Sequence, residues 1–192
     1  NNTINFDPLA DRETQDRRLA LETARAVLMP GGGTLCLFTA RQSLGFAAEL
    51  LRSSPHFLEQ KLELYAQEPD CLTRSDLRKK FKKSQGQGVL LGARSFWEGV
   101  DIPGVVHSLI IPRLPFPNIG DPVHSARCEW YDDGFANEGF ASFEMYTLPL
   151  MLQLLRQGLG RGIRKKSDRC VVHILDSRAG WSTYADRVAR LF

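Results

Sequence analysis

The stretch Gln157-Gly-Leu-Gly-Arg-Gly-Ile-Arg164 ends a leucine-rich run, and the rest of the chain is organised around it. On a helix, residues spaced three and four apart share one face, which here groups Gln157, Gly160, Arg161 and Arg164. The apolar stripe expected on the other face is Leu148, Met151, Leu152, Leu155 and Leu159. Guanidinium groups suit phosphate oxygens because they are permanently charged and forked. A solvated basic helix end is the simpler interpretation. It explains neither the glutamine nor glycines inside a helix, where each costs up to about 1 kcal/mol. We therefore predict a phosphate-binding helix.

Length and composition restrict the class of protein. The 192 residues fit one domain with its own core. The net charge of +3 is small, so any nucleic-acid site must be local. No apolar run reaches the length of a membrane span, and no secretory signal opens the chain. The cysteines lack metal-ligand spacing, so we expect reduced thiols and no metal site: they are Cys36, Cys71, Cys128 and Cys170. Because the chain begins at Asn1, we expect a segment of a longer protein.

Short apolar runs alternate with amphipathic segments along the chain. Strands are expected at residues 34–39, 88–93, 105–111 and 170–175, with a weaker candidate at 61–67. Helices are expected at 11–29, 41–53, 75–83 (capped by Ser75), 121–135, from about 147 onward with Pro149 in the first turn, and at 182–192. Residues 136–144 look like a small insertion before the Gln157–Arg164 helix. This alternation predicts an α/β fold with a parallel sheet and helices on both faces.

Polar residues follow the predicted strands, where folds of this class place their chemistry. The run Arg94-Ser-Phe-Trp-Glu-Gly-Val-Asp-Ile-Pro-Gly104 holds Glu98 and Asp101 in one tight turn. An acid-capped loop without function is an equally good interpretation of that turn. We expect Trp97 to be a buried anchor rather than a base-stacking residue. The basic cluster at residues 78–83 is a possible nucleic-acid contact, although a solvated helix face accounts for it better.

Taken together, these stretches resemble the second motor domain of a superfamily 2 helicase of the DinG/XPD type. Residues 33–40 resemble helicase motif IV, 95–101 motif V, and 157–164 motif VI. The family's shorter signatures are matched by Leu114-Pro-Phe-Pro117, Asp121-Pro122 and Asp176-Ser-Arg178. Each match alone is weak, but their shared order within one domain is specific.

The resemblance implies a RecA-like half-motor that binds ATP in a cleft between two domains. Arg161 and Arg164 would act as arginine fingers on the γ-phosphate, and Gln157 would orient the water or the phosphates. The residues implied near the nucleotide are Glu98, Gly99, Asp101 and Gly160. Those implied near single-stranded DNA are Phe38, Thr39, Arg41, Arg94 and Ser95, the first two through backbone amides. The family resemblance also implies 5′ to 3′ movement.

Some features depart from the family pattern. Ala40 stands where the family usually has serine, and Gly162 replaces a bulkier residue, which should loosen the finger helix. The sequence has neither a Gly-x-x-x-x-Gly-Lys-Ser/Thr loop nor a magnesium-binding acidic box. We therefore expect the first motor domain to hold most of the ATP and Mg²⁺, and this domain alone to be inactive. The family's iron–sulfur cluster, where present, belongs to that other domain.

Two further possibilities remain open at this point. The chain could be a RecA-like module that binds nucleic acid or a protein without turnover. It could also belong to a larger nucleoprotein complex for DNA repair or CRISPR-associated defence. For the helicase interpretation the implied partners are single-stranded DNA and the N-terminal motor domain, with no membrane contact, in the bacterial cytoplasm.

Overall fold

A computed structural model describes residues 11–29, 32–69, 72–98, 104–135, 141–163 and 169–192 of the chain, and a five-stranded sheet lies at its centre. The strands lie in the order β2-β3-β1-β4-β5, and each neighbouring pair is parallel. Their bounds are Thr34–Leu37 (β1), Glu63–Ala66 (β2), Gly88–Gly92 (β3), Ser108–Ile111 (β4) and Val171–Ile174 (β5). The parallel α/β architecture confirms the fold class predicted from the alternating pattern.

Burial distinguishes the central strands from the edge strands. Every residue of β1, β3 and β4 is buried, which explains why these segments read as continuous apolar runs. The edge strand β2 is only partly buried, in keeping with its weaker signal. The strand predicted from residue 105 begins only at Ser108, because the chain turns at Gly104, where φ is 74°.

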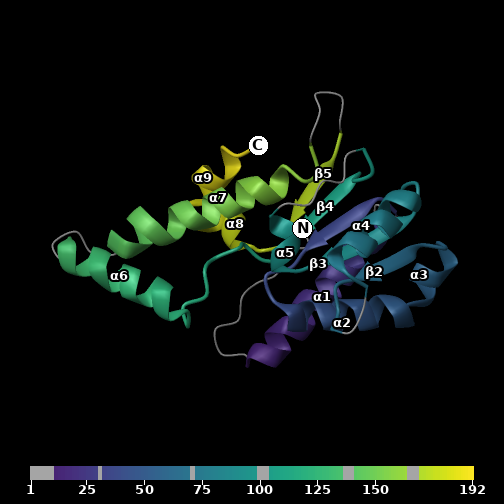
Figure 1. Ribbon diagram of the computed structural model, residues 1–192, viewed down its shortest axis with the longest axis horizontal. Coiled ribbons are helices and arrows are strands. Elements are labelled where there is room, and N and C mark those ends of the chain that lie inside the picture. Colours follow the sequence, from purple (N-terminus) through teal and green to yellow (C-terminus); the bar gives the residue numbers. More distant parts are fainter. Residues whose placement is uncertain (1–10, 30–31, 70–71, 99–103, 136–140, 164–168) are drawn as a thin grey trace.

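Helices cover both faces of the sheet, as predicted (Figure 1). Along β1, Leu35 and Leu37 join one core cluster, whereas Cys36 joins the other, because successive strand side chains point to opposite faces. The Cys36 cluster includes residues of α1 (Arg12–Leu28), α2 (Arg41–Ser53) and α3 (Pro55–Glu59). The other includes residues of α4 (Arg74–Lys83), α5 (Arg94–Trp97), α7 (Leu148–Leu159) and α9 (Ala185–Ala189).

Local capping sets the helix starts. The Asp11 carboxylate accepts a hydrogen bond from the Thr14 N–H at 2.9 Å, so α1 begins at the next residue. The α2 helix has the predicted bounds. The predicted Ser75 cap of α4 is wrong, because the Thr73 hydroxyl accepts from the Asp76 N–H and the helix begins at Arg74.

A helical arm extends away from the sheet (Figure 1). It consists of α6 (Pro122–Gly134) and a π-helical turn, η1 (Phe143–Thr147), that runs directly into α7. The rings of Tyr131 and Tyr146 stack at 5.6 Å and join α6 to η1. Residues 141–144 of the predicted insertion are thus helical and lead into α7, whereas residues 136–140 lie outside the described ranges.

The predicted closing helix at 182–192 is wrong in extent. A short α8 (Arg178–Trp181) comes first, and the Ser182 N–H closes it by donating to the Arg178 carbonyl at 3.2 Å. Ser182 itself is extended, with ψ at 166°, so the chain leaves the helical conformation before α9. No helix among the described residues is both long and apolar enough to cross a membrane.

Candidate functional site

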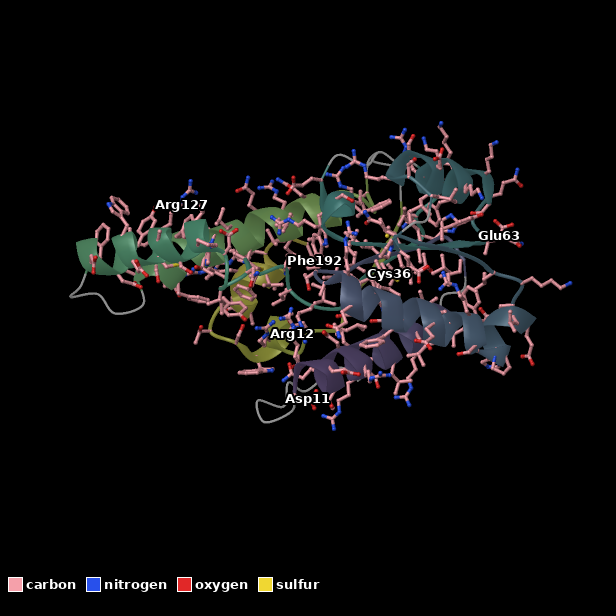
Figure 2. All side chains as sticks on the ribbon, turned by 60° about the horizontal axis from the view of Figure 1, so that its bottom comes forward. Asp11, Arg12, Cys36, Glu63, Arg127 and Phe192 are labelled. Carbon is pink, nitrogen blue, oxygen red and sulfur yellow. The ribbon has the colours of Figure 1, made fainter. Side chains whose placement is uncertain are left out.

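The carboxyl ends of the parallel strands meet at one edge of the sheet, and segments that follow four strands line a groove of about 650 Å³ there. We call it the arginine groove because its lining includes Arg12, Arg41, Arg94, Arg113 and Arg178. Figure 2 shows Arg12 at the start of α1, toward the middle of the molecule. The described residues that line the groove include no Asp or Glu. Although the net charge of the chain is small, arginines are concentrated in this groove.

The Asp176-Ser-Arg178 stretch fixes one of these guanidiniums. Asp176 is buried and accepts from the Leu114 N–H at 3.0 Å and from Arg178 Nε at 2.9 Å. Burial alone would raise the pKa of Asp176, but the hydrogen bonds and charge of Arg178 outweigh it, and the net pKa is lowered. The Arg178 guanidinium carbon also lies 5.2 Å from the centre of the Phe116 ring. These contacts therefore join the segment after β4 to the segment after β5 at the groove.

The predicted strand-contact residues are brought together here. Thr39, Arg41 and Arg94 line the arginine groove. The same three residues and Ser95 also line an adjoining pocket of about 310 Å³. Residues from motif IV and motif V thus share one surface, although more than fifty positions separate them in the sequence.

Phe38 does not belong to that surface. Its side chain is fully buried, and its N–H donates to the Gly92 carbonyl at 2.8 Å. The expectation that the Phe38 amide is open to a phosphate is therefore wrong, because the amide completes the pairing of β1 with β3. The exposed Thr39 is the member of this pair for which strand contact remains a prediction.

Two residues that the sequence did not single out position Ser95. Gln67, directly after β2, donates from Nε2 to Ser95 Oγ at 2.8 Å and accepts from the Ala93 N–H at 2.9 Å. Arg74, at the start of α4, donates to the Ser95 carbonyl at 3.1 Å. Only the sheet order brings β2 and α4 beside this turn, so local sequence patterns carried no signal for either residue.

Trp97 is the buried centre of a contact between the three motifs. Its indole N–H donates to the Phe38 carbonyl at 2.9 Å, and its own carbonyl accepts from Arg161 Nε at 3.1 Å. A Cβ at Gly158 would lie 2.8 Å from ring carbons of Trp97. The predicted role of Trp97 as a buried anchor is confirmed, and the close approach explains a glycine inside α7. We call these four residues the Trp97 junction.

Gln157 and Arg161 do not lie on one continuous helix. The α7 helix ends at Leu159, Gly160 is its C-cap, and Arg161 lies in the turn that follows. The Arg161 N–H donates to the Gly158 carbonyl at 2.9 Å, which closes this turn. The periodicity predicted a longer helix because it did not account for the chain leaving α7 at Gly160.

The buried stripe of α7 is also rotated from its predicted position. Leu154 and Gly158 are buried, whereas Leu152 and Leu159 are only partly buried. Gly162 does not loosen a helix, because it lies beyond the end of α7. A Cβ there would lie 2.7 Å from Cys170 Sγ, so close packing against the start of β5 requires a small residue.

A second pocket, of about 340 Å³, adjoins the arginine groove and is called the side pocket here. Two residues predicted near the nucleotide, Gln157 and Glu98, line it. Glu98 is exposed and lies 3.8 Å from Arg94, a distance at which an exposed ion pair contributes little. Arg161 and Gly160 are not in its lining, and Arg161 instead contacts the Trp97 carbonyl.

Gly99, Asp101 and Arg164 lie outside the described residues. Within the described ranges, no group of three or more His, Cys, Asp or Glu side chains could hold a metal ion. A magnesium site thus finds no match in the part of the chain that the structure describes.

The fold and the groove define a parallel α/β domain with a basic surface at the carboxyl edge of its sheet. Residues 24–192 match the helicase C-terminal domain family. The chain belongs to that family and is a C-terminal helicase domain of the DinG/XPD type.

Known relatives agree with this assignment. The chain is 34% identical over 151 residues to "3'-5' exonuclease DinG" of Bacillus subtilis, an alignment covering 78% of this chain and 16% of that protein. It is 34% identical over 166 residues to "ATP-dependent helicase DinG" of Mycobacterium tuberculosis, covering 86% of this chain and 23% of the relative. The fold resembles a solved XPD helicase with a TM-score of 0.65 and 18% identity, covering 98% of this chain and 32% of that chain. The chain thus spans less than a quarter of the length of these two DinG relatives.

Proposed function

We propose that the chain is the second motor domain of an ATP-dependent DNA helicase of the DinG type, acting in the bacterial cytoplasm. A first motor domain of the same protein would hold ATP and Mg²⁺. Arg161 and Arg164 would approach the γ-phosphate, and Gln157 would orient the attacking water or the phosphates. Glu98, Gly99, Asp101 and Gly160 would border the nucleotide.

The observation that carries this proposal is the arginine groove. Proteins that bind single strands do so in positively charged grooves that follow the phosphates, and five guanidiniums from separate parts of the chain line this one depression. The exposed hydroxyl of Thr39 adds a hydrogen-bonding group at its margin. Arg178 is already held in place by Asp176, so one cation loses little conformational freedom on binding.

The Trp97 junction supplies a physical connection between strand and nucleotide. The turn that bears Ser95 ends in Trp97, and the carbonyl of Trp97 holds Arg161. A shift of this turn on strand binding would therefore move the guanidinium proposed to act on ATP. Hydrolysis of bound ATP supplies the free energy for movement. Residues of this chain would position Arg161 at the nucleotide and would bind and release the strand alternately. We propose that movement runs 5′ to 3′.

The test uses the protein that contains this chain together with a first motor domain. We expect Arg161→Ala to reduce strand-stimulated ATP turnover by about 10³-fold or more, with single-strand binding largely retained. Arg156→Ala is the matched control, because Arg156 is an exposed arginine on α7 that lines neither the groove nor the side pocket. Unchanged turnover in Arg161→Ala would mean that Arg161 is not at the nucleotide, and a domain that binds nucleic acid or a protein without contributing to turnover, within a repair or CRISPR-associated complex, would be the better account.

Unwinding is measured separately from turnover, because the Bacillus relative is named an exonuclease rather than a helicase. Partial duplexes with a single-stranded tail at either the 5′ or the 3′ end distinguish the two directions. Displacement only from the 5′-tailed duplex is expected. Displacement from the 3′-tailed duplex alone would reverse the proposed polarity.

A further inference from the structure

We propose that the side pocket binds one nucleobase of the single strand whose phosphates occupy the arginine groove. This inference rests on the proposed function and assigns a ligand to a cavity that the strand-contact residues do not account for. The two sites are contiguous, because Arg94, Pro115 and Leu154 line both. A strand in the groove therefore lies directly beside the opening of the pocket.

The two linings differ in charge, although Arg94 belongs to both. The groove has five guanidiniums, and no carboxylate is found among its described lining residues. The side pocket is lined by two carboxylates, Glu98 and Asp121, and two carboxamides, Gln153 and Gln157. Carboxylates repel phosphate but accept hydrogen bonds from the amino groups of bases, and carboxamides can both donate and accept. The pocket thus suits the part of a nucleotide that the groove does not.

Apart from Arg94, the remaining lining of the pocket is apolar or aromatic. It comes from the loop after β4, the start of α6, η1 and α7, and consists of Pro115, Pro117, Val123, Tyr146, Leu150 and Leu154, together with His124. Flat or apolar walls with a few polar groups are typical of small-molecule sites, whose volumes run from about 300 to 1,000 Å³. A volume of about 340 Å³ falls at the lower end of that range, which suits a single base.

The wall of the pocket on the side of the helical arm is preformed. The Tyr146 ring lies between the rings of His124, at 5.3 Å, and Tyr131, at 5.6 Å, and stacks with both. Arg127 donates to the Tyr146 hydroxyl at 3.1 Å, and Figure 2 shows Arg127 on this arm, away from the sheet. Asp121 Oδ1 accepts from the Val123 N–H at 2.9 Å, so one carboxylate is fixed at the start of α6.

One histidine in the lining of the pocket carries a polar atom without a partner among the described residues. His124 is 7% exposed, and its Nδ1 is the one buried side-chain polar atom in the described lining of the pocket without a hydrogen-bond partner. A buried ring nitrogen without a partner is unfavourable.

The carboxylates also predict which bases bind best. Cytosine and adenine carry exocyclic amino donors, whereas thymine offers carbonyl acceptors on the corresponding edge. We therefore expect cytosine or adenine to occupy the pocket about two- to ten-fold more tightly than thymine, the effect of about one net hydrogen bond.

The experiment uses the protein with both motor domains and a tailed duplex, whose junction fixes the register of the strand. One abasic position is moved stepwise along the tail, and affinity is measured at each step. At one position, loss of the base is expected to weaken binding about five- to a hundred-fold, the range for one buried base. Cytosine, adenine and thymine are then compared at that position.

Asp121→Asn is the diagnostic variant, because Asp121 is a carboxylate of the side pocket, is absent from the lining of the groove, and keeps an oxygen that can cap α6 when it becomes an amide. We expect it to abolish the sensitivity to base identity while binding to the remaining tail persists. Gln42→Ala is the matched control, since this carboxamide lines the groove only. It should weaken binding of all tails equally and leave the base preference intact.

The outcomes separate this proposal from the proposed function. Strand binding with equal affinity for every abasic position would overturn the base pocket and leave the motor intact. Absence of strand binding by the unaltered protein would overturn both.

Discussion

The arginine groove and the Trp97 junction adjoin each other, and Trp97 contributes to both, yet they are built in opposite ways. Arginine side chains at the surface dominate the groove, whereas Trp97, Phe38 and Gly158 in the junction are buried and in close contact. Substitution in the first should change binding with little loss of stability. Substitution in the second should disturb packing and, with it, the position of Arg161. Under the proposed function, the groove would select the ligand and the junction would transmit its presence.

The largest effect is expected from Trp97→Ala. Removing a fully buried indole leaves a cavity and an unsatisfied Phe38 carbonyl, and should lower the free energy of unfolding by about 3–5 kcal/mol. Urea unfolding followed by circular dichroism measures it. Trp97→Phe keeps most of the ring but loses the N–H donor, so it should cost less. A loss under about 1 kcal/mol in the alanine variant would remove the basis for treating the junction as a packed unit.

Asp176→Asn tests the boundary between the two regions, because Asp176 is buried but its partner Arg178 lines the groove. Loss of a charged, hydrogen-bonded carboxylate should cost about 1.5–3 kcal/mol near neutral pH. The pKa of Asp176 is lowered in the folded state, so its stabilisation is complete above its unfolded pKa of about 3.9 and disappears as pH falls through the folded value.

Unfolding of the unaltered protein and of Asp176→Asn is therefore compared from neutral to acidic pH. Their difference should be constant near neutrality and shrink below about pH 4. Asp186→Asn, at an exposed position on α9, should show no comparable difference. A gap that is independent of pH would mean that Asp176 acts through its shape rather than its charge.

Gly158→Ala tests the packing of the junction with the addition of one methyl group. The new Cβ would lie 2.8 Å from Trp97 and 3.2 Å from Leu37 Cδ1, so overpacking should cost about 1–2 kcal/mol despite alanine's better helix propensity. Gly45→Ala is the control. Gly45 lies inside α2 with nothing within 4 Å of a new Cβ, and the substitution should stabilise by about 0.5–1 kcal/mol. Equal effects at the two glycines would contradict the close contact with Trp97.

The sequence predicted the core of this fold better than its surfaces. Buried strands read clearly because β1, β3 and β4 consist of continuous apolar residues, and Ala40 and Ser54 flank an α2 helix whose length the apolar periodicity defines. The start of α4 was misplaced because two residues able to cap it, Thr73 and Ser75, lie close together. The choice between them depends on the actual backbone geometry rather than on residue type.

The site was only partly predictable, for a different reason. Motif resemblance indicated Arg41 and Arg94, and both line the groove. Arg12 and Arg113 join them only because α1 and the segment after β4 approach the same edge of the sheet, a consequence of strand order that local patterns do not contain. For the same reason the sequence could not show that the Phe38 amide is used by β3.

The smallest effect on stability, and the clearest effect on binding, is expected from Arg113→Ala in the groove. The side chain is partly exposed, so the free energy of unfolding should change by no more than about 0.5 kcal/mol. If Arg113 neutralises one phosphate, the slope of the logarithm of single-strand affinity against that of salt concentration should decrease by about 1. Arg190→Ala removes an exposed arginine outside the groove lining and should leave this slope unchanged. Equal slopes for both variants would mean that the strand follows another surface, and a stability loss in Arg113→Ala would mean that the groove is part of the packed core rather than a ligand-selecting surface.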